Sequence, residues 1–106
     1  MPKAVFVVQT NPASPEQEAE FNHWYDKIHV PEICSISGFV SAKRYKLSGP
    51  SAPGTPAYLA IYEIDADDPA APLAEIKRRS AAGELSMSDT LQMDPTPIVA
   101  LYDGLG

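Results

Sequence analysis

The sequence predicts an α+β fold whose elements follow the order β-α-β-β-α-β. Four short runs rich in β-branched and aromatic residues are bounded by turn-forming residues, and two segments with helical character follow the first and third runs. The chain has 106 residues, of which 44% are hydrophobic and 21% are charged. This size and composition predict a single packed domain over residues 1–106.

The first predicted strand is the β-branched run AVFVVQ at residues 4–9, and the segment SPEQ after it has the form of a capping box. The Ser14 side chain can accept a hydrogen bond from the Gln17 N–H, and the Gln17 side chain can reach back. Pro15 suits the first helical position, because a residue there needs no N–H donor. These residues predict the start of the first helix.

Apolar residues of this helix form one stripe that we expect to be buried. They are spaced i, i+3, i+4 and i+7 and comprise Phe21, Trp24, Tyr25 and Ile28. Pro31 is expected to end the regular helix, because proline disfavours the helical conformation of the residue before it. The segment PEICSI could add a further short turn.

Two more strands are predicted at residues 39–47 and 57–64, joined by a loop rich in Pro, Gly and Ser. Asp68 can cap the N-terminus of the second helix, and Gly83 is expected to end it. The inward-facing residues of this helix are expected to be Leu73 and Ile76. The last strand is predicted at residues 97–104.

This order is the ferredoxin-like arrangement, a four-stranded antiparallel sheet with both helices on one face. Strand alternation places two sets of apolar side chains on opposite faces of the third strand. One set is Tyr58, Ala60, Tyr62 and Ile64, and the other is Leu59 and Ile61. Because the helices can cover only one face, we expect a second subunit to cover the other in a homodimer.

The formal net charge of −6 argues against a nucleic-acid or anionic-membrane partner, because both need basic patches. No apolar run is long enough to span a bilayer. The N-terminal segment MPKAVFVVQT has the character of a strand and not of a signal peptide. Cys34 is the only cysteine, which excludes an intrachain disulfide and fits a cytoplasmic location.

Residues 21–32, FNHWYDKIHVPE, carry the strongest chemical pattern. Asn22, Asp26 and His29, spaced i, i+4 and i+7, are predicted to form a polar seam beside the buried stripe. There Asp26 could accept a hydrogen bond from His29, fix its tautomer and raise its basicity for general acid/base catalysis. Alternatively, His29 is a boundary residue that caps the last helical carbonyls.

Several other side chains are candidates for substrate binding. They are Asn22, Trp24, Tyr25, Arg44, Tyr45, Tyr58 and Tyr62. Tyrosine hydroxyls that line a cavity would orient a polar ligand group, although strand tyrosines also pack as plain half-buried aromatics. Arg44 is expected to point outward as a solvated charge; if it points inward, it would bind a carboxylate or an enolate.

The sequence argues against a cofactor. His23 lies too far around the helix from His29 to join it in a metal site, so we expect no metal; the alternative is a site completed by carboxylates from another strand. No phosphate-binding loop, dinucleotide fingerprint or nucleophile elbow is present.

Residues 21–47 resemble the first helix and second strand of EthD-like proteins of the dimeric α+β barrel superfamily. The matching positions are Trp24, Tyr25, Asp26, His29, Pro31, Gly38, Arg44 and Tyr45. The resemblance implies a homodimer with a ligand cavity between helix and sheet in each subunit. It also implies that His29 and Asp26 correspond to a recurrent histidine and its acidic neighbour.

Proteins of this kind include cofactor-free monooxygenases, muconolactone isomerases, polyketide cyclases and decarboxylases, and some haem enzymes. The haem enzymes need an axial histidine set elsewhere on the fold, so we expect no haem here. The sequence thus favours a cofactor-independent isomerase, lyase or monooxygenase in small-molecule catabolism or secondary metabolism. Its substrate would be a small, partly apolar carbonyl, lactone or phenolic compound. The alternatives are a non-catalytic binding or accessory protein and a plain structural dimer.

Overall fold

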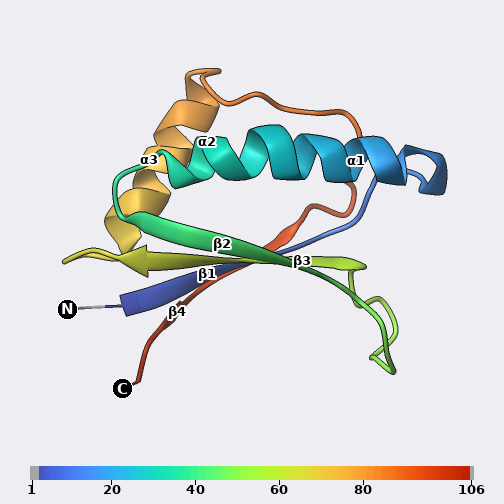
Figure 1. Cartoon of the computed structure of the whole chain (residues 1–106), viewed down its shortest axis with the longest axis horizontal. Coiled ribbons are helices and arrows are strands. Elements are labelled where there is room, and N and C mark those ends of the chain that lie inside the picture. Colours follow the sequence, from blue (N-terminus) through green and yellow to red (C-terminus); the bar gives the residue numbers. More distant parts are fainter. Residues whose placement is uncertain (1–2, 106) are drawn as a thin grey trace.

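The computed structural model describes residues 3–105 and confirms the predicted order of elements (Figure 1). Four strands form one antiparallel sheet in the order β2-β3-β1-β4. They are β1 (Lys3–Thr10), β2 (Phe39–Lys46), β3 (Tyr58–Asp65) and β4 (Ile98–Asp103). Each boundary lies within one residue of its predicted place, and residues 1, 2 and 106 of the predicted domain lie outside the described part.

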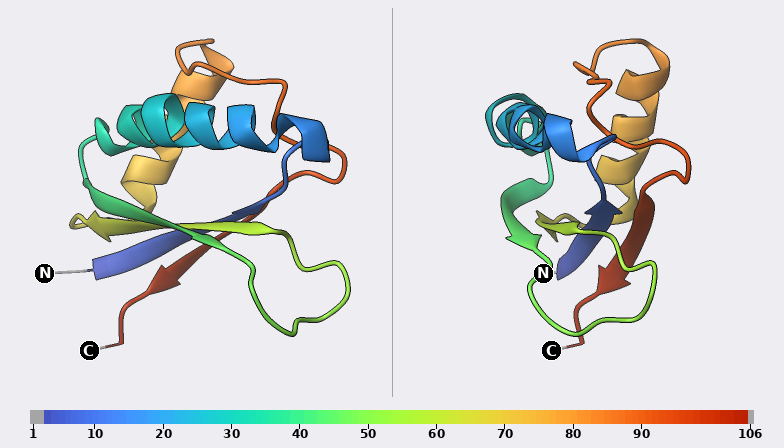
Figure 2. Two further views of the ribbon diagram at one scale, coloured as in Figure 1. Left: turned by 45° about the vertical axis from the view of Figure 1, so that its right-hand side comes forward. Right: turned by 90° about the vertical axis from the view of Figure 1, so that its right-hand side faces the viewer.

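Helices lie on one face of this sheet and leave the other face bare (Figures 1 and 2). The third strand shows the predicted alternation: Tyr58, Ala60, Tyr62 and Ile64 are buried under the helices. Leu59 and Ile61 lie on the bare face and are half-buried. No helix within residues 3–105 is long and apolar enough to cross a membrane.

The first helical region is longer than predicted and changes its winding along its length. It comprises a 3-10 turn η1 (Pro15–Gln17), α1 (Glu18–Trp24), a π-helical turn η2 (Tyr25–His29) and α2 (Val30–Cys34). The prediction that Pro31 ends the helix is therefore wrong. The Val30 N–H donates to the Tyr25 carbonyl, five residues back, as in a π-helix. Pro31 lies in the first turn of α2, where a residue without a backbone N–H is tolerated.

The π-helical turn also changes which side chains reach the core. Phe21, Trp24 and Tyr25 are buried as predicted, but Ile28 is 39% exposed. The spacing i+7 holds for an α-helix, and a wider turn rotates later residues away from that face. Ile33 is buried in its place.

The helix starts follow the predicted residues, with one difference in detail. The Ser14 hydroxyl donates to the Gln17 side-chain oxygen at 2.9 Å, and the Gln17 N–H donates to the Ser14 carbonyl instead of the side chain. This replaces the predicted side-chain cap.

The second helix, α3 (Ala70–Ala81), begins and ends as predicted. The Asp68 carboxylate accepts from the Ala70 N–H at 3.1 Å, and Gly83 follows the helix with a φ of +72°, which glycine adopts without strain. Leu73 and Ile76 pack against the core as expected.

Candidate functional site

A cavity of about 200 Å³ lies between the first helical region and the sheet. Its helical wall consists of Tyr25, His29 and Ile33, and its sheet wall includes Phe6, Val8, Tyr62 and Val99. The third wall is the segment of residues 84–97 between α3 and β4, called the strap below (Figures 1 and 2). The strap contributes Met87, Leu91, Met93 and Pro97. The walls are therefore mostly apolar, with Thr10, His29 and the two tyrosines as exceptions.

His29 faces this cavity, and its Nδ1 atom is buried without a hydrogen-bond partner among the described residues. Its ring stacks on Trp24, with 4.7 Å between ring centroids, and meets the Tyr25 ring edge-on at 5.0 Å. Burial lowers the pKa of His29 to about 4, against an opposing contribution from the Glu32 carboxylate. The imidazole is therefore neutral at pH 7.

The predicted hydrogen bond between Asp26 and His29 is absent. The Asp26 side chain is 56% exposed and accepts a hydrogen bond from Arg44 Nη1 at 2.9 Å. Because both residues belong to the π-helical turn, their spacing differs from the α-helical one on which the predicted seam depended. The alternative role of His29 as a helix cap is also wrong, because the helix continues to Cys34.

Arg44 points inward, contrary to the expectation that it is a solvated charge. Its side chain is only 13% exposed, and its guanidinium carbon lies 4.2 Å from the centroid of the Tyr25 ring. Arg44 pairs with Ala60 across the sheet, and Ala60 is on the helix-covered face. Sheet register therefore determines its direction.

Arg44 belongs to a cluster of polar side chains whose hydrogen bonds are formed within the cluster or with neighbouring residues. Arg44 Nη2 donates to the Asn22 side-chain oxygen at 2.9 Å, and the Asn22 amide donates to the Tyr58 hydroxyl at 3.0 Å. The Tyr58 hydroxyl in turn donates to the Glu18 carboxylate at 2.5 Å. We call Asn22, Asp26, Arg44 and Tyr58 the Arg44 cluster.

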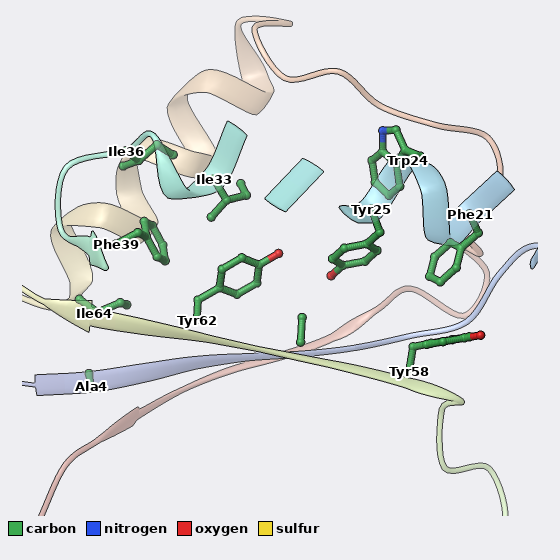
Figure 3. Packing of buried hydrophobic residues seen from close by; sticks show 11 residues of the cluster. Ala4, Phe21, Trp24, Tyr25, Ile33, Ile36, Phe39, Tyr58, Tyr62 and Ile64 are labelled. Atoms are coloured by element: carbon green, nitrogen blue, oxygen red, sulfur yellow. The ribbon is translucent and has the colours of Figure 1, made fainter. Parts of the chain in front are cut away.

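Tyr62 differs from Tyr58, although both point from β3 toward the helix. The Tyr62 hydroxyl is buried and forms no well-aligned hydrogen bond among residues 3–105, although the Tyr25 hydroxyl lies close enough to affect its pKa. Figure 3 shows the hydroxyls of Tyr25 and Tyr62 pointing toward one another. Burial raises the pKa of both phenols, so both stay protonated at neutral pH and can donate hydrogen bonds.

Five of the seven predicted binding residues lie outside the cavity wall, and only Tyr25 and Tyr62 belong to it. Three of the five are members of the Arg44 cluster, and the other two are Tyr45 and Trp24. Tyr45 is on the bare face of the sheet and 48% exposed, because alternation on β2 sends it away from Arg44. Trp24 packs behind His29, and its indole N–H donates to the Ser86 carbonyl at 2.9 Å.

The wall residues from the strap were missed from the sequence. Met87, Leu91 and Met93 lie in a segment without helical or strand periodicity, so no local pattern indicated that they face the site. Within the described part of the chain, no three His, Cys, Asp or Glu side chains gather as a metal site would require. The absence of a cofactor stays a prediction.

No family model and no curated protein matches the sequence. Solved structures do match the whole chain. A candidate monooxygenase from Shewanella loihica PV-4 superposes with a TM-score of 0.60 at 17% identity, covering 100% of this chain and 98% of that one. An EthD family protein from Bacillus halodurans C-125 gives a TM-score of 0.61 at 16% identity, covering 99% and 100%. The fold is EthD-like. HapK from Hahella chejuensis shares it, with a TM-score of 0.57 at 16% identity and coverage of 100% and 92%.

At these identities the likeness concerns the fold and not the reaction. The EthD-like fold places a cavity between helix and sheet here, as the resemblance in residues 21–47 implied.

Proposed function

We propose that the protein is a cofactor-independent enzyme that moves a proton on a small, mostly apolar ketone, lactone or phenol, with His29 as the general base. One observation carries this proposal: His29 and Tyr62 line the same apolar cavity, and neither His29 Nδ1 nor the Tyr62 hydroxyl has a well-aligned hydrogen-bond partner among residues 3–105. Buried polar groups are normally paired, so unpaired ones that face a cavity suit a ligand.

The size of the cavity indicates the size of the ligand. An apolar cavity of about 150 Å³ holds benzene, so the cavity of about 200 Å³ here suits one substituted ring. The apolar walls would hold the ring, and the two polar groups would meet one oxygen-bearing edge of it.

The two polar groups suit complementary parts of one proton transfer. Neutral His29 has a free ring nitrogen that can take a proton from a carbon next to a carbonyl, or from a phenol. The protonated Tyr62 hydroxyl would donate a hydrogen bond to the oxygen on which negative charge develops. The new imidazolium and this oxyanion would then attract one another in a site of low polarity. A candidate monooxygenase with the same fold is compatible with this scheme, since phenol oxygenation can begin with the same deprotonation.

Deuterium exchange tests this proposal without knowledge of the natural substrate. A small cyclic ketone such as cyclohexanone is incubated with the protein in D2O, and loss of its α-proton signal is followed by NMR. We expect His29→Ala to reduce the catalysed rate by at least about 100-fold, since a positioned base contributes that much or more. His23→Ala is the matched control, because His23 is exposed on the same helical region. Equal rates in the two variants would refute a role for His29 as base.

The alternative is a non-catalytic protein that binds the same class of ligand. It is favoured by the missing contact between Asp26 and His29, because an imidazole with a lowered pKa is a weak base. The same experiment separates the two: the alternative predicts shifted ligand signals, which report binding, with no exchange above the background rate.

We also propose that a second copy of the chain covers the bare face of the sheet. This face carries exposed Tyr45, Ile98 and Tyr102 around the half-buried Ile61. Apolar side chains gathered on one sheet face are typical of an interface. Sedimentation should show a dimer for the wild type and a monomer for Ile61→Glu; a monomeric wild type would exclude the interface.

A further inference from the structure

Beyond its first residue, Glu84, which bonds back to α3, the strap is held at two separate places. In its middle, the Ala13 N–H donates to the Thr90 carbonyl at 2.6 Å and the Gln92 N–H donates to the Asn11 carbonyl at 2.9 Å. Thr90 is also almost completely buried. This central attachment can act as a fixed end for the part of the strap that precedes it.

The second attachment is Ser86, whose polar groups all bond to the first helical region. Its N–H and its hydroxyl donate to the Glu32 carboxylate at 3.0 and 2.8 Å. Its carbonyl accepts from the indole N–H of Trp24. In Figure 3 the indole nitrogen of Trp24 lies on the side of the helix that the strap passes. Ser86 therefore joins Glu32 in α2 to Trp24 in α1 from outside the helix.

Both residues held by Ser86 lie next to His29. Trp24 stacks on the imidazole, and Glu32 lies three positions after it in the chain. Between the two attachments, Met87 lines the cavity although its side chain is 59% exposed. The segment from Ser86 to Thr90 therefore borders solvent through Met87 and the Trp24–His29 stack through Ser86.

We propose that Glu32 is a positioning residue for His29. By holding Ser86, its carboxylate keeps the start of the strap and the Trp24 indole against the imidazole, and so keeps water away from the ring. The inference deepens the proposed function, because the proposed proton transfer needs an imidazole that is held in one position against the substrate. Without the Glu32–Ser86 contacts, we expect the segment before Thr90 to swing outward with Met87.

The charges around His29 make the effect measurable. The neighbouring ionisable groups are Glu32 and Tyr25 on its own helical region, Arg44 on β2 and Tyr62 on β3. Removal of the Glu32 charge alone would lower the pKa of His29 further. Hydration of the ring would raise that pKa toward its ordinary value of 6.5, and burial is the larger of the two influences. A positioning role and a purely electrostatic role therefore predict opposite directions.

The test is an NMR titration of the His29 ring in Glu32→Ala, which removes both acceptor oxygens. We expect the pKa of His29 to rise from about 4 by at least about one unit. Exchange of the Trp24 indole proton with D2O should also accelerate by about tenfold, since its acceptor moves away. An unchanged or lowered pKa of His29 would overturn the proposal.

Two further variants control the experiment. Glu84→Ala removes a carboxylate of the same strap that pairs with Arg78, 3.3 Å away, and it should leave both readouts unchanged. Glu32→Gln keeps one acceptor oxygen and should give a smaller rise than Glu32→Ala; it also replaces Glu32→Ala if that variant does not fold. The exposed His23 serves as an internal reference in each titration.

The titration needs no substrate, so its outcome is independent of the exchange assay. If His29→Ala leaves exchange unaltered while Glu32→Ala raises the pKa of His29, the base assignment fails and the positioning role stands. The reverse pair of results would refute the positioning role alone.

Discussion

Two groups of polar side chains contact Tyr25, and they differ in whether their hydrogen-bonding atoms have partners. Arg44 lies over this ring, with its guanidinium carbon 4.2 Å from the ring centroid, and belongs to a cluster in which donors and acceptors are matched. His29 meets the same ring edge-on, with 5.0 Å between the ring centroids; it lines the cavity, and its buried Nδ1 has no partner among residues 3–105. Both groups lie under the same helical region, so burial alone does not distinguish them.

The difference indicates which group serves the fold and which serves a ligand. A matched cluster stabilises the folded chain, and its loss should be costly. An unpaired buried group lowers stability, so it persists where it has another use. The Arg44 cluster is therefore better explained as structure, and the pair of His29 and Tyr62 as the ligand-binding site.

The largest expected effect concerns acid stability. The pKa of His29 is about 4 in the folded protein and near 6.5 when unfolded, so the unfolded chain binds more protons between these values. Stability should therefore fall as the pH drops from 6.5 to 4, by up to about 3 kcal/mol from this residue. Urea unfolding of the wild type and of His29→Phe over this range isolates the contribution. Parallel pH dependences would show that His29 is not buried as a neutral ring.

The second-largest expected effect is a difference in the free energy of unfolding between two variants, each of which removes one polar side chain that contacts Tyr25. Arg44→Met loses hydrogen bonds to Asp26 and Asn22 and should cost about 2 kcal/mol. His29→Phe keeps an aromatic ring against Trp24 and removes the unpaired nitrogen, so it should be neutral or stabilising by about 1 kcal/mol at pH 7. Equilibrium unfolding in urea at pH 7 measures both. If His29→Phe is as destabilising as Arg44→Met, the imidazole is part of the core and not of a ligand site.

The smallest expected effect is the difference in stability between Tyr58→Phe and Tyr62→Phe. It is the most direct comparison, because both variants lose the same hydroxyl group. Tyr58→Phe removes a hydroxyl with two partners and should cost about 1 kcal/mol. Tyr62→Phe removes a hydroxyl on the same strand and face that makes no well-aligned hydrogen bond among residues 3–105 and only approaches the Tyr25 hydroxyl, so it should cost less than Tyr58→Phe. Thermal unfolding of the two variants gives the difference. A greater loss in Tyr62→Phe would mean that its hydroxyl already has a structural partner.

Local patterns in the sequence were sufficient to predict the order of the elements and the bounds of the strands. Each strand boundary was predicted within one residue, because β-branched runs and turn residues act over a few neighbours. Asp68 and Gly83 set the ends of α3 for the same reason. The alternation along β3 correctly assigned Tyr62 to the helix-covered face.

The sequence identified His29 but paired it with the wrong carboxylate. An α-helical wheel placed Asp26 and His29 on one face of the helix. In the structure the π-helical turn changes their spacing, and Asp26 accepts a hydrogen bond from Arg44 instead. This turn accommodates Pro31, and periodicity gives no signal for it, because an α-helical pattern assumes constant winding.

The sequence by itself determined the order of elements, the buried face of each strand and the presence of a histidine beside that face. Only the tertiary structure decided which polar groups are matched and which are left to face a cavity. Arg44 reaches Asp26 from 18 residues away, and the strap that closes the cavity contacts Glu32 from 54 residues away. Periodicity reports the side of an element on which a residue lies, but partners are fixed by the packing of elements that are distant in the chain.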